Sequence, residues 1–418
     1  MKIIKGNIVE SQSLNSVRFI KDGGILIDDN GTIVDVLEKI PNDTRYQIED
    51  YKDKLIMHSF CDMHLHAPQY PMVGMGMDLQ LIDWLNTYTF KNEARFKDLD
   101  FARKVYHRLA NELIKNGTTR VVMFSSLHVD ATLVLMEELE KAGVTGYVGK
   151  VNMDRNSVPE LYESTEESKQ ETLRWLKECK KFKFVKPIIT PRFTPSCTNE
   201  LMEFLGNLAE KEGLFIQSHL SENLGEIEWV HSLHPDTKQY WETYDKYKMW
   251  KDHTLMAHTV HSDERERKAM KDNGVISVHC PDSNVNLSSG VCPVRTFLNE
   301  GIWVVLGSDI AGGSMLPMYK NIQAAIKASK INYIRSGYKD MFLSVNEAYY
   351  LGTSSAHKYF DKSEGFVKGK KLHAIVVDDS NFTPSVRELS LKERFERAIY
   401  MMEKENIISV YSEGRKIF

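Results

Sequence analysis

The chain has few cysteines, and they lie far apart. Five occur among 418 residues, and no two of them form a Cys-x-x-Cys pair. A disulfide framework needs a dense, even-numbered set of cysteines, so none is expected here. Sparse and isolated thiols are typical of a reducing compartment, which predicts a cytoplasmic location.

Long apolar runs and an excess of positive charge are also missing. No apolar stretch approaches the length that spans a membrane, and Met1 to Lys5 lack the apolar core of a signal peptide. The formal net charge is −4, which argues against nucleic-acid binding through a basic field. We therefore expect no membrane and no nucleic acid as partners.

Both ends of the chain carry short strand-like runs that are bounded by turns, including a turn at Gly23-Gly24. These runs are residues 16–21, 24–27, 32–36, 373–378 and 407–411. A few strands at either end cannot bury a core by themselves. The pattern predicts that residues 1–57 and 366–418 pair into one small β-sandwich domain, with the rest of the chain inserted between them.

The middle of the chain alternates between apolar strand-like runs and helical patterns. The strand at the end of which His64 lies is followed by candidate strands at 119–124, 146–151, 185–190, 214–218, 254–257, 275–278 and 302–306. Helical patterns fall at 101–115, 131–142, 166–180, 199–212 and 262–272, and glycines stand where several of them should end. The alternation predicts a (β/α)8 barrel over residues 58–365, with a doubly wound open sheet as the alternative.

Two longer segments interrupt this alternation. Residues 67–100 separate the first strand from its helix, and residues 312–340 follow the eighth strand. Long segments at the carboxyl ends of barrel strands usually cover an active site or form a contact between subunits. Either role is open for both segments.

Histidines and an aspartate follow several of the predicted strands. His64 and His66 lie two residues apart, so in a strand they share one face. His219, His258 and Asp309 end the fifth, sixth and eighth strands. In a barrel these carboxyl ends meet at one rim, whereas each residue alone would be an ordinary buried histidine or a capping aspartate.

Three imidazoles and a carboxylate suit Zn²⁺, with Fe²⁺ as the second choice. Such an ion lowers the pKa of a bound water toward neutrality. A second ion would need a bridging group, and strand four ends in Thr190 to Phe193 without a lysine. The sequence therefore predicts one ion per chain.

Proton transfer needs further groups beside the metal. Glu222 follows His219 by three residues and can reach the same rim. Asp309 can both bind a metal and accept a proton. The alternative for Glu222 is a residue that simply lies at a helix N-terminus and interacts with the helix dipole.

Taken together, these motifs resemble the amidohydrolase superfamily, and within it the members that deaminate guanine. The resemblance covers nearly the whole chain and rests on Ser59-Phe-Cys-Asp-Met-His-Leu-His-Ala-Pro-Gln-Tyr70, Asp78 to Leu85, Thr190 to Phe193, Gln217 to Glu222, Val278 to Asn284 and Leu306 to Gly313. The His-Ala-Pro-Gln-Tyr and Pro-Arg-Phe runs are the parts that resemble the guanine-specific members.

The resemblance implies hydrolysis of guanine to xanthine and ammonia by a homodimer that binds zinc. It places the metal ligands on His64, His66, His219 and Asp309. It places substrate contacts on Gln69, Arg192 and Phe193, together with His219 and Glu222. Catalytic proton transfer and polarisation fall to Glu222, Asp309 and His258. The guanidinium of Arg192 can donate to the O6 and N7 acceptors of guanine, and Phe193 offers a stacking or edge contact to the flat ring.

Other interpretations remain open from the residues alone. The same chemistry could act on another amino- or halo-heterocycle, or the chain could be a metal-free scaffold of this fold. Arg192 could pair with a neighbouring carboxylate, and Gln69 could merely fasten a loop. His279 is expected to be structural, and Asp282 has no assigned role.

Overall fold

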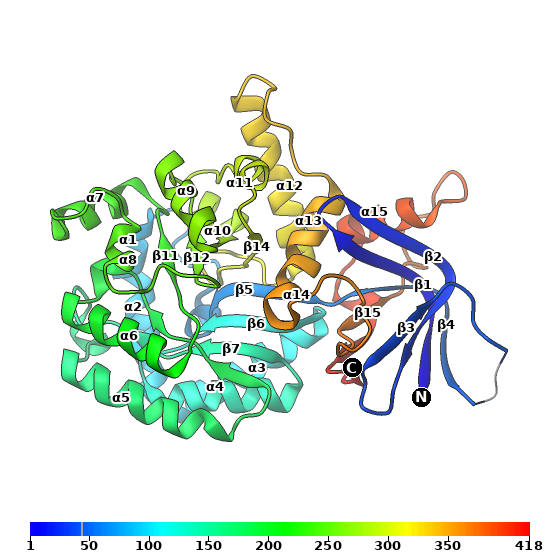
Figure 1. Cartoon of the computed structure of the whole chain (residues 1–418), viewed down its shortest axis with the longest axis horizontal. Coiled ribbons are helices and arrows are strands. Elements are labelled where there is room, and N and C mark those ends of the chain that lie inside the picture. The colour runs from blue at the N-terminus through cyan, green and yellow to red at the C-terminus, as the bar shows by residue number, and fades with distance from the viewer. Residues whose placement is uncertain (43–44) are drawn as a thin grey trace.

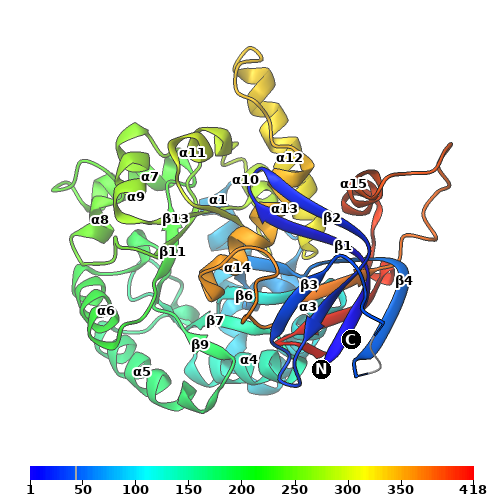
Figure 2. The same ribbon diagram turned by 45° about the vertical axis from the view of Figure 1, so that its right-hand side comes forward.

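The computed structural model describes residues 1–42 and 45–418 and consists of a barrel beside a large sheet (Figure 1). The sheet is built from both ends of the chain, as the sequence predicts, and both termini lie at it (Figures 1 and 2). It is a single seven-stranded sheet in the order β17-β16-β15-β4-β1-β2-β3. Its strands are β1 (Lys2–Ser13), β2 (Ser16–Ile27), β3 (Ile33–Leu37), β4 (Gln47–His58), β15 (Ala374–Val377), β16 (Ile407–Ser412) and β17 (Arg415–Lys416). The division of the chain into domains at residues 57/58 and 365/366 stays a prediction.

The predicted turn at Gly23-Gly24 is wrong, because β2 runs through both glycines without a break. A Cβ on Gly23 would lie 2.8 Å from the carbonyl oxygen of Leu37, and one on Gly24 would lie 2.7 Å from Cγ2 of Ile3. These glycines allow close packing inside the sheet rather than a reversal of the chain. The sequence reading also missed α15 (Leu391–Met401), whose Phe395 packs against Phe19 of β2.

The middle of the chain forms the predicted (β/α)8 barrel. Parallel pairing joins β5-β6-β7-β9 and β11-β12-β13-β14, and a bridge between Ile189 and Ile216 connects the two sets. The barrel closes where the amide of Asp309 donates to the carbonyl of His64 at 2.8 Å and the amide of His66 donates to the carbonyl of Ile310 at 2.9 Å. The strands are β5 (Phe60–His66), β6 (Thr118–Phe124), β7 (Thr145–Gly149), β8 (Val151–Asn152), β9 (Val185–Pro187), β10 (Thr190–Pro191), β11 (Gln217–Leu220), β12 (Leu255–His258), β13 (Ile276–His279) and β14 (Val304–Leu306).

Helices surround the barrel strands, and four of them end at a glycine as the sequence predicts. Gly143, Gly213, Gly274 and Gly301 have positive φ, the left-handed conformation that glycine adopts most easily. The main helices are α3 (Leu99–Lys115), α4 (Val129–Ala142), α5 (Thr165–Glu178), α6 (Asn199–Glu212), α7 (Leu224–Leu233), α8 (Glu242–Asp245), α9 (Glu264–Asn273), α10 (Pro281–Asn286), α11 (Val294–Glu300), α12 (Met318–Arg335), α13 (Val345–Gly352) and α14 (Ser354–Asp361).

The two long segments both contain helical structure. Residues 67–100 form short helical turns, which are η1 (Ala67–Met72), α1 (Leu81–Trp84), η2 (Leu85–Thr89), α2 (Phe90–Ala94) and η3 (Arg95–Lys97). Most of residues 312–340 is α12, which projects from the molecule (yellow in Figure 1). In the described part of the chain, no helix combines the length and the apolar character needed to cross a membrane.

Three buried histidines lie where the terminal sheet meets the barrel. Nδ1 of His357 accepts a hydrogen bond from Nη1 of Arg120 at 3.0 Å, and Nε2 of His357 donates one to the carbonyl oxygen of Ser59 at 2.8 Å. His373 lies 2.9 Å from Oγ1 of Thr119, and His58 stacks on Phe366. Burial lowers the pKa of all three well below the usual value, so they are neutral in the folded protein.

These histidines predict that acid destabilises the fold. The unfolded chain takes up protons on them below about pH 6.5 while the folded chain does not. Each of these histidines should therefore contribute a loss of up to about 1.4 kcal/mol of unfolding free energy per pH unit as the pH falls below about 6.5. Buried carboxyls whose pKa is raised to about 7, such as those of Asp62 and Glu226, contribute in the opposite direction. Chemical unfolding of variants at several pH values therefore isolates the histidine contribution. His373→Gln should lose less free energy than the wild type as the pH falls, and His231→Gln, at an exposed position, should behave as the wild type; the same pH dependence in His373→Gln as in the wild type would contradict the prediction.

An interior strand of the sheet, β15, predicts a second stability effect. Ile375 of β15 is completely buried, whereas Ile408 of β16 is 40% exposed. Ile375→Ala should lower the free energy of unfolding by about 2–5 kcal/mol, because it leaves a cavity in packed surroundings. Ile408→Ala is the matched control and should change it by less than about 0.5 kcal/mol. Equal effects of the two substitutions would refute this account of the sheet core.

Candidate active site

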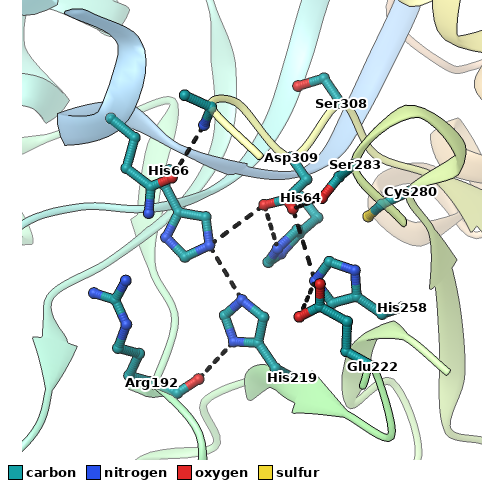
Figure 3. Close-up of polar contacts among 12 residues, drawn as sticks. His64, His66, Arg192, His219, Glu222, His258, Cys280, Ser283, Ser308 and Asp309 are labelled. Carbon is teal, nitrogen blue, oxygen red and sulfur yellow. Dashed lines mark hydrogen bonds and ion pairs between the residues drawn. The ribbon is translucent and has the colours of Figure 1, made fainter. Parts of the chain in front are cut away.

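The histidines and the aspartate that end the barrel strands point at one another (Figure 3). Nε2 of His66 lies 3.1 Å from Nε2 of His219, and Nε2 of His64 lies 3.2 Å from Oδ1 of Asp309. The same Oδ1 is 3.5 Å from Nε2 of His66. His258 faces the cluster from β12, with Nε2 3.8 Å from Oδ2 of Asp309. The structure thus brings together all five residues that the sequence places at the strand ends.

This cluster has the chemistry of a site for a divalent metal. Burial lowers the pKa of His64, His66 and His219, so their imidazoles are neutral and each can offer a lone pair. Nε2 of His64 is buried and lies 3.2 Å from Oδ1 of Asp309, but among the described residues it makes no hydrogen bond of good geometry. A buried polar atom without a hydrogen bond is costly unless a ligand satisfies it. His64 also belongs to two groups of possible ligand atoms, one with His66 and Asp309 and one with His219 and His258, so the cluster fits a metal ion.

Hydrogen bonds from outside the cluster fix the orientation of two imidazoles. Nδ1 of His219 lies 2.6 Å from the carbonyl oxygen of Arg192. Because a carbonyl can only accept, Nδ1 carries the proton and Nε2 is left with its lone pair toward the cluster. Nδ1 of His258 is held by Oδ1 of Asn284 at 2.8 Å.

The loop that carries Asp309 is fastened on both sides. Ser283 donates to Oδ2 of Asp309, and the amide of Ser308 donates to Oδ1 of Asp62 at 2.9 Å. Although burial alone would raise it, contact with His64 and His258 lowers the pKa of Asp309, which is therefore a carboxylate. One oxygen faces the histidines and the other is hydrogen-bonded, so the carboxylate has a defined orientation.

Glu222 lies beside this cluster rather than at the surface. Its side chain is buried, with Oε2 3.5 Å from Nε2 of His258 and Oε1 accepting from Ser289 at 3.2 Å. Burial and then the charge of Asp309 raise the pKa of Glu222 well above its usual value. A carboxyl group with a raised pKa can hold a proton near neutral pH and deliver it to a ligand. The side chain is therefore not merely a neighbour of the α7 N-terminus, where Asn223 supplies the cap.

The remaining predicted site residues line a pocket above the cluster. Gln69, Arg192 and Phe193 line the same pocket as Glu222 and His258. The further lining residues are His66, Leu81, Trp84, Leu85, His219, Glu226, Leu287 and Asp309. Segment 67–100 thus supplies one wall, which agrees with the expectation that it covers a site.

Arg192 and Gln69 also make the structural contacts considered above as alternatives to substrate binding, namely a carboxylate pair for Arg192 and a loop contact for Gln69. The guanidinium of Arg192 pairs with Glu93 through both terminal nitrogens, and Gln69 bonds the amide of Ala311 at 3.0 Å. Since both residues line the pocket as well, a structural contact and a ligand contact are compatible for each.

Two further glutamates of the site, Glu226 and Glu93, were not predicted from the sequence. Glu226 accepts from the amide of Glu222 at 2.9 Å and from the hydroxyl of Tyr240 at 2.7 Å. Burial and then the charge of Glu222 raise the pKa of Glu226 to about 7. The offset of four residues from Glu222 is the spacing of a helix turn and could have indicated this contact. Glu93, by contrast, lies in the irregular segment 67–100.

His279, at the end of strand seven, and Asp282, just after it, lie in different surroundings. Oδ2 of Asp282 accepts from the amide of Ser314 at 2.7 Å and thereby joins the loops that follow strands seven and eight. His279 is buried, and within the described residues neither ring nitrogen has a hydrogen-bond partner. Burial lowers the pKa of His279 to about 3, so it is a neutral packing residue.

Comparisons with known proteins agree along the whole chain. A model of the amidohydrolase family matches residues 55–417. Guanine deaminase of Dictyostelium discoideum is 36% identical over 443 residues, which cover 100% of this chain and 98% of that protein. Guanine deaminase of Rattus norvegicus is 36% identical over 441 residues, which cover 99% and 96%. A crystal structure of guanine deaminase from C. acetobutylicum, with bound guanine in the active site, is 46% identical, covers 100% of both chains and has a TM-score of 0.96.

The cluster predicts how metal content depends on single histidines. His219→Ala removes one of three facing nitrogen ligands and should weaken metal binding at least about 100-fold, since even residues that only orient a ligand contribute 10–100-fold. Elemental analysis of dialysed protein measures the effect. His231→Ala, on the exposed face of α7, is the control and should retain full metal. Equal metal content in both variants would exclude His219 as a ligand.

Proposed function

The chain belongs to the amidohydrolase family, and we propose that it hydrolyses guanine to xanthine and ammonia. The observation that carries this proposal is the arrangement of one pocket. One pocket is lined by a metal-competent histidine cluster, a proton-holding glutamate and the hydrogen-bond donors Arg192 and Gln69. The guanine deaminases that match the chain over its whole length support the choice of substrate.

The metal is proposed to be one Zn²⁺ per chain, held by His64, His66, His219 and Asp309, with Fe²⁺ as the second choice. Nitrogen and carboxylate donors of this kind suit either ion. When bound, the ion supplies the Lewis acidity that makes a water nucleophilic near neutral pH. Thr190 to Phe193 offer no lysine for a second ion, which supports one ion per chain.

The protein's own groups move the protons of the reaction. The carboxylate of Asp309 accepts a proton from the attacking water, and Nε2 of His258 hydrogen-bonds the attacking oxygen. The carboxyl of Glu222 gives its proton to a ring nitrogen as the C–O bond forms at C2. Asp309 then passes its proton to the amino group, and the proton of the new hydroxyl group on C2 passes to Glu222. The C–N bond breaks as C2=O forms, which releases ammonia and xanthine and returns both carboxyl groups to their starting states.

The same pocket holds the base. N–H donors of Arg192 and Gln69 match the O6 and N7 acceptors of guanine. Phe193 contacts the edge of His219 with ring centroids 6.5 Å apart and offers a flat apolar surface to the purine. His219 and Glu222 flank the carbon that reacts. Leu81, Trp84 and Leu85 cover the pocket and exclude bulk water.

We also propose that the chain works as a cytoplasmic homodimer. Each of the five cysteines lies in the described part of the chain and is a free, buried thiol, which supports a reducing compartment. The projecting end of α12 and the turn after it expose Ile334, Tyr338 and Met341 at 58%, 66% and 61%. An exposed apolar group of this kind supports a contact between subunits there.

An assay of xanthine and ammonia released from guanine tests the function. The purified protein should produce both in equal amounts, and chelation should abolish activity that Zn²⁺ restores. Glu222→Gln cannot release a proton and should lower kcat by about 10²–10⁴-fold while metal content is unchanged. Full activity of Glu222→Gln would remove its role in proton transfer.

A panel of other heterocycles separates the proposal from its alternatives. Activity on halogenated triazines or imidazolones without activity on guanine would refute guanine as the substrate. Protein that binds no metal and gains no activity on addition of Zn²⁺ would instead indicate a scaffold without catalysis.

A further inference from the structure

Glu93 does not line the pocket itself but is hydrogen-bonded to two residues that do, Gln69 and Arg192. It lies on α2, in the segment that covers the site, and is 2% exposed. Its Oε1 accepts from Nε2 of Gln69 at 2.8 Å and from Nη2 of Arg192 at 3.1 Å. Its Oε2 accepts from Nη1 of Arg192 at 2.5 Å. One buried carboxylate therefore holds both proposed base-binding side chains.

The carboxylate determines how the amide of Gln69 is turned. An ionised carboxylate can only accept hydrogen bonds, and the amide nitrogen of Ala311 can only donate. Because Gln69 lies between them, its nitrogen must face Glu93 and its oxygen must face Ala311. The side-chain oxygen of Gln69 is thereby occupied, and what the amide can still offer to a ligand is an N–H group.

The same contacts shape Arg192. Arginine has five N–H donors and no acceptor, and only part of this set is used by Glu93. Phe90, one helical turn before Glu93 on α2, lies 5.0 Å below the guanidinium carbon. The guanidinium is thus held by charge on one side and by a ring on another. Its charge is cancelled by Glu93, which suits an uncharged ligand.

These observations together describe a part of the pocket in which the side chains of Arg192 and Gln69 present mainly N–H donors. Oε1 of Glu93 already accepts two hydrogen bonds, Oε2 of Glu93 accepts one, and the oxygen of Gln69 accepts one. A purine with oxygen at C6 presents acceptors at O6 and N7, whereas one with an amino group at C6 presents a donor there. A donor placed against donors leaves buried N–H groups unpaired, which costs free energy.

We propose that Glu93 is a positioning residue that gives the pocket its preference for 6-oxopurines over 6-aminopurines. The inference rests on the proposed function, since it concerns the base that the same pocket binds. Glu93 acts through Arg192 and Gln69, and within the described part of the chain no hydrogen bond or ion pair joins it to the histidine cluster. Its loss should therefore change which base is bound more than it changes the metal.

The test compares guanine with 2,6-diaminopurine, which keeps the 2-amino group and carries an amino group in place of O6. Glu93→Gln keeps the size of the side chain but can donate to Gln69 and lacks the charge that neutralises Arg192. We expect kcat/KM for guanine to fall about 10- to 100-fold, mainly through KM, because buried donors lose their fixed partner. The ratio of kcat/KM for guanine to that for 2,6-diaminopurine should fall at least about tenfold.

Glu138→Gln is the matched control. Glu138 is a buried glutamate on α4 that accepts from Nη1 of Arg103 at 2.7 Å, outside the pocket. It should leave kcat, KM and the ratio unchanged. A purely structural role of Glu93 would lower both substrates equally, so an unchanged ratio in Glu93→Gln overturns the proposal. Wild-type protein without activity on guanine would overturn the proposed function instead.

Wild-type protein provides a second test that needs no folded variant. Hypoxanthine carries O6 without the 2-amino group, and adenine carries an amino group at C6. As competitive inhibitors of guanine turnover, hypoxanthine should bind at least about tenfold more tightly than adenine. Equal inhibition constants would show that the donor arrangement held by Glu93 does not select the base.

Discussion

The closure of the barrel between β5 and β14 is the constraint on which the site depends. The hydrogen bonds that close it are made by the main chain of His64, His66 and Asp309 themselves or of the adjacent Ile310. The residues that gather around the metal position are therefore also the seam of the fold. The geometry of the metal site therefore depends on the closure of the barrel, because the two main-chain hydrogen bonds that close it also bring these side chains to the same rim.

Burial then gives these side chains their chemistry. Deep in the rim, imidazoles lose their charge and keep lone pairs, whereas Glu222 retains a proton. A bound ion would satisfy the buried Nε2 of His64, and coordination by the imidazoles and the carboxylate would offset the cost of removing the ion from water. Hydrogen bonds from Arg192, Asn284 and Ser283 hold the polar atoms in fixed orientations without making them accessible to solvent.

Local sequence pattern predicted the parts of the molecule that depend on local physics. The period of two in His-x-His places two imidazoles on one face of a strand, and glycines with positive φ end helices at 143, 213 and 274. The turn expected at Gly23-Gly24 failed because glycine serves close packing as well as reversal. Glu93 was missed because its partner Arg192 lies 99 residues further on, and no local spacing encodes such a contact. Helix α15 was missed although it carries local signals: Ser390 and Glu393 form a capping box, and the buried Phe395, Ala398 and Ile399 follow helical spacing.

The position of Glu93 on α2 separates two tasks that share one pocket. Groups for bond cleavage stand on the strands and strand ends of the barrel, which cannot shift without opening its seam. Groups that hold the base are adjusted from a short helix in a segment outside the barrel wall. A different α2 could present different acceptors to Gln69 and Arg192, while the catalytic groups at the barrel rim stay the same. Substrate range can thus change by exchange of a surface segment, while the reaction itself remains encoded in the scaffold.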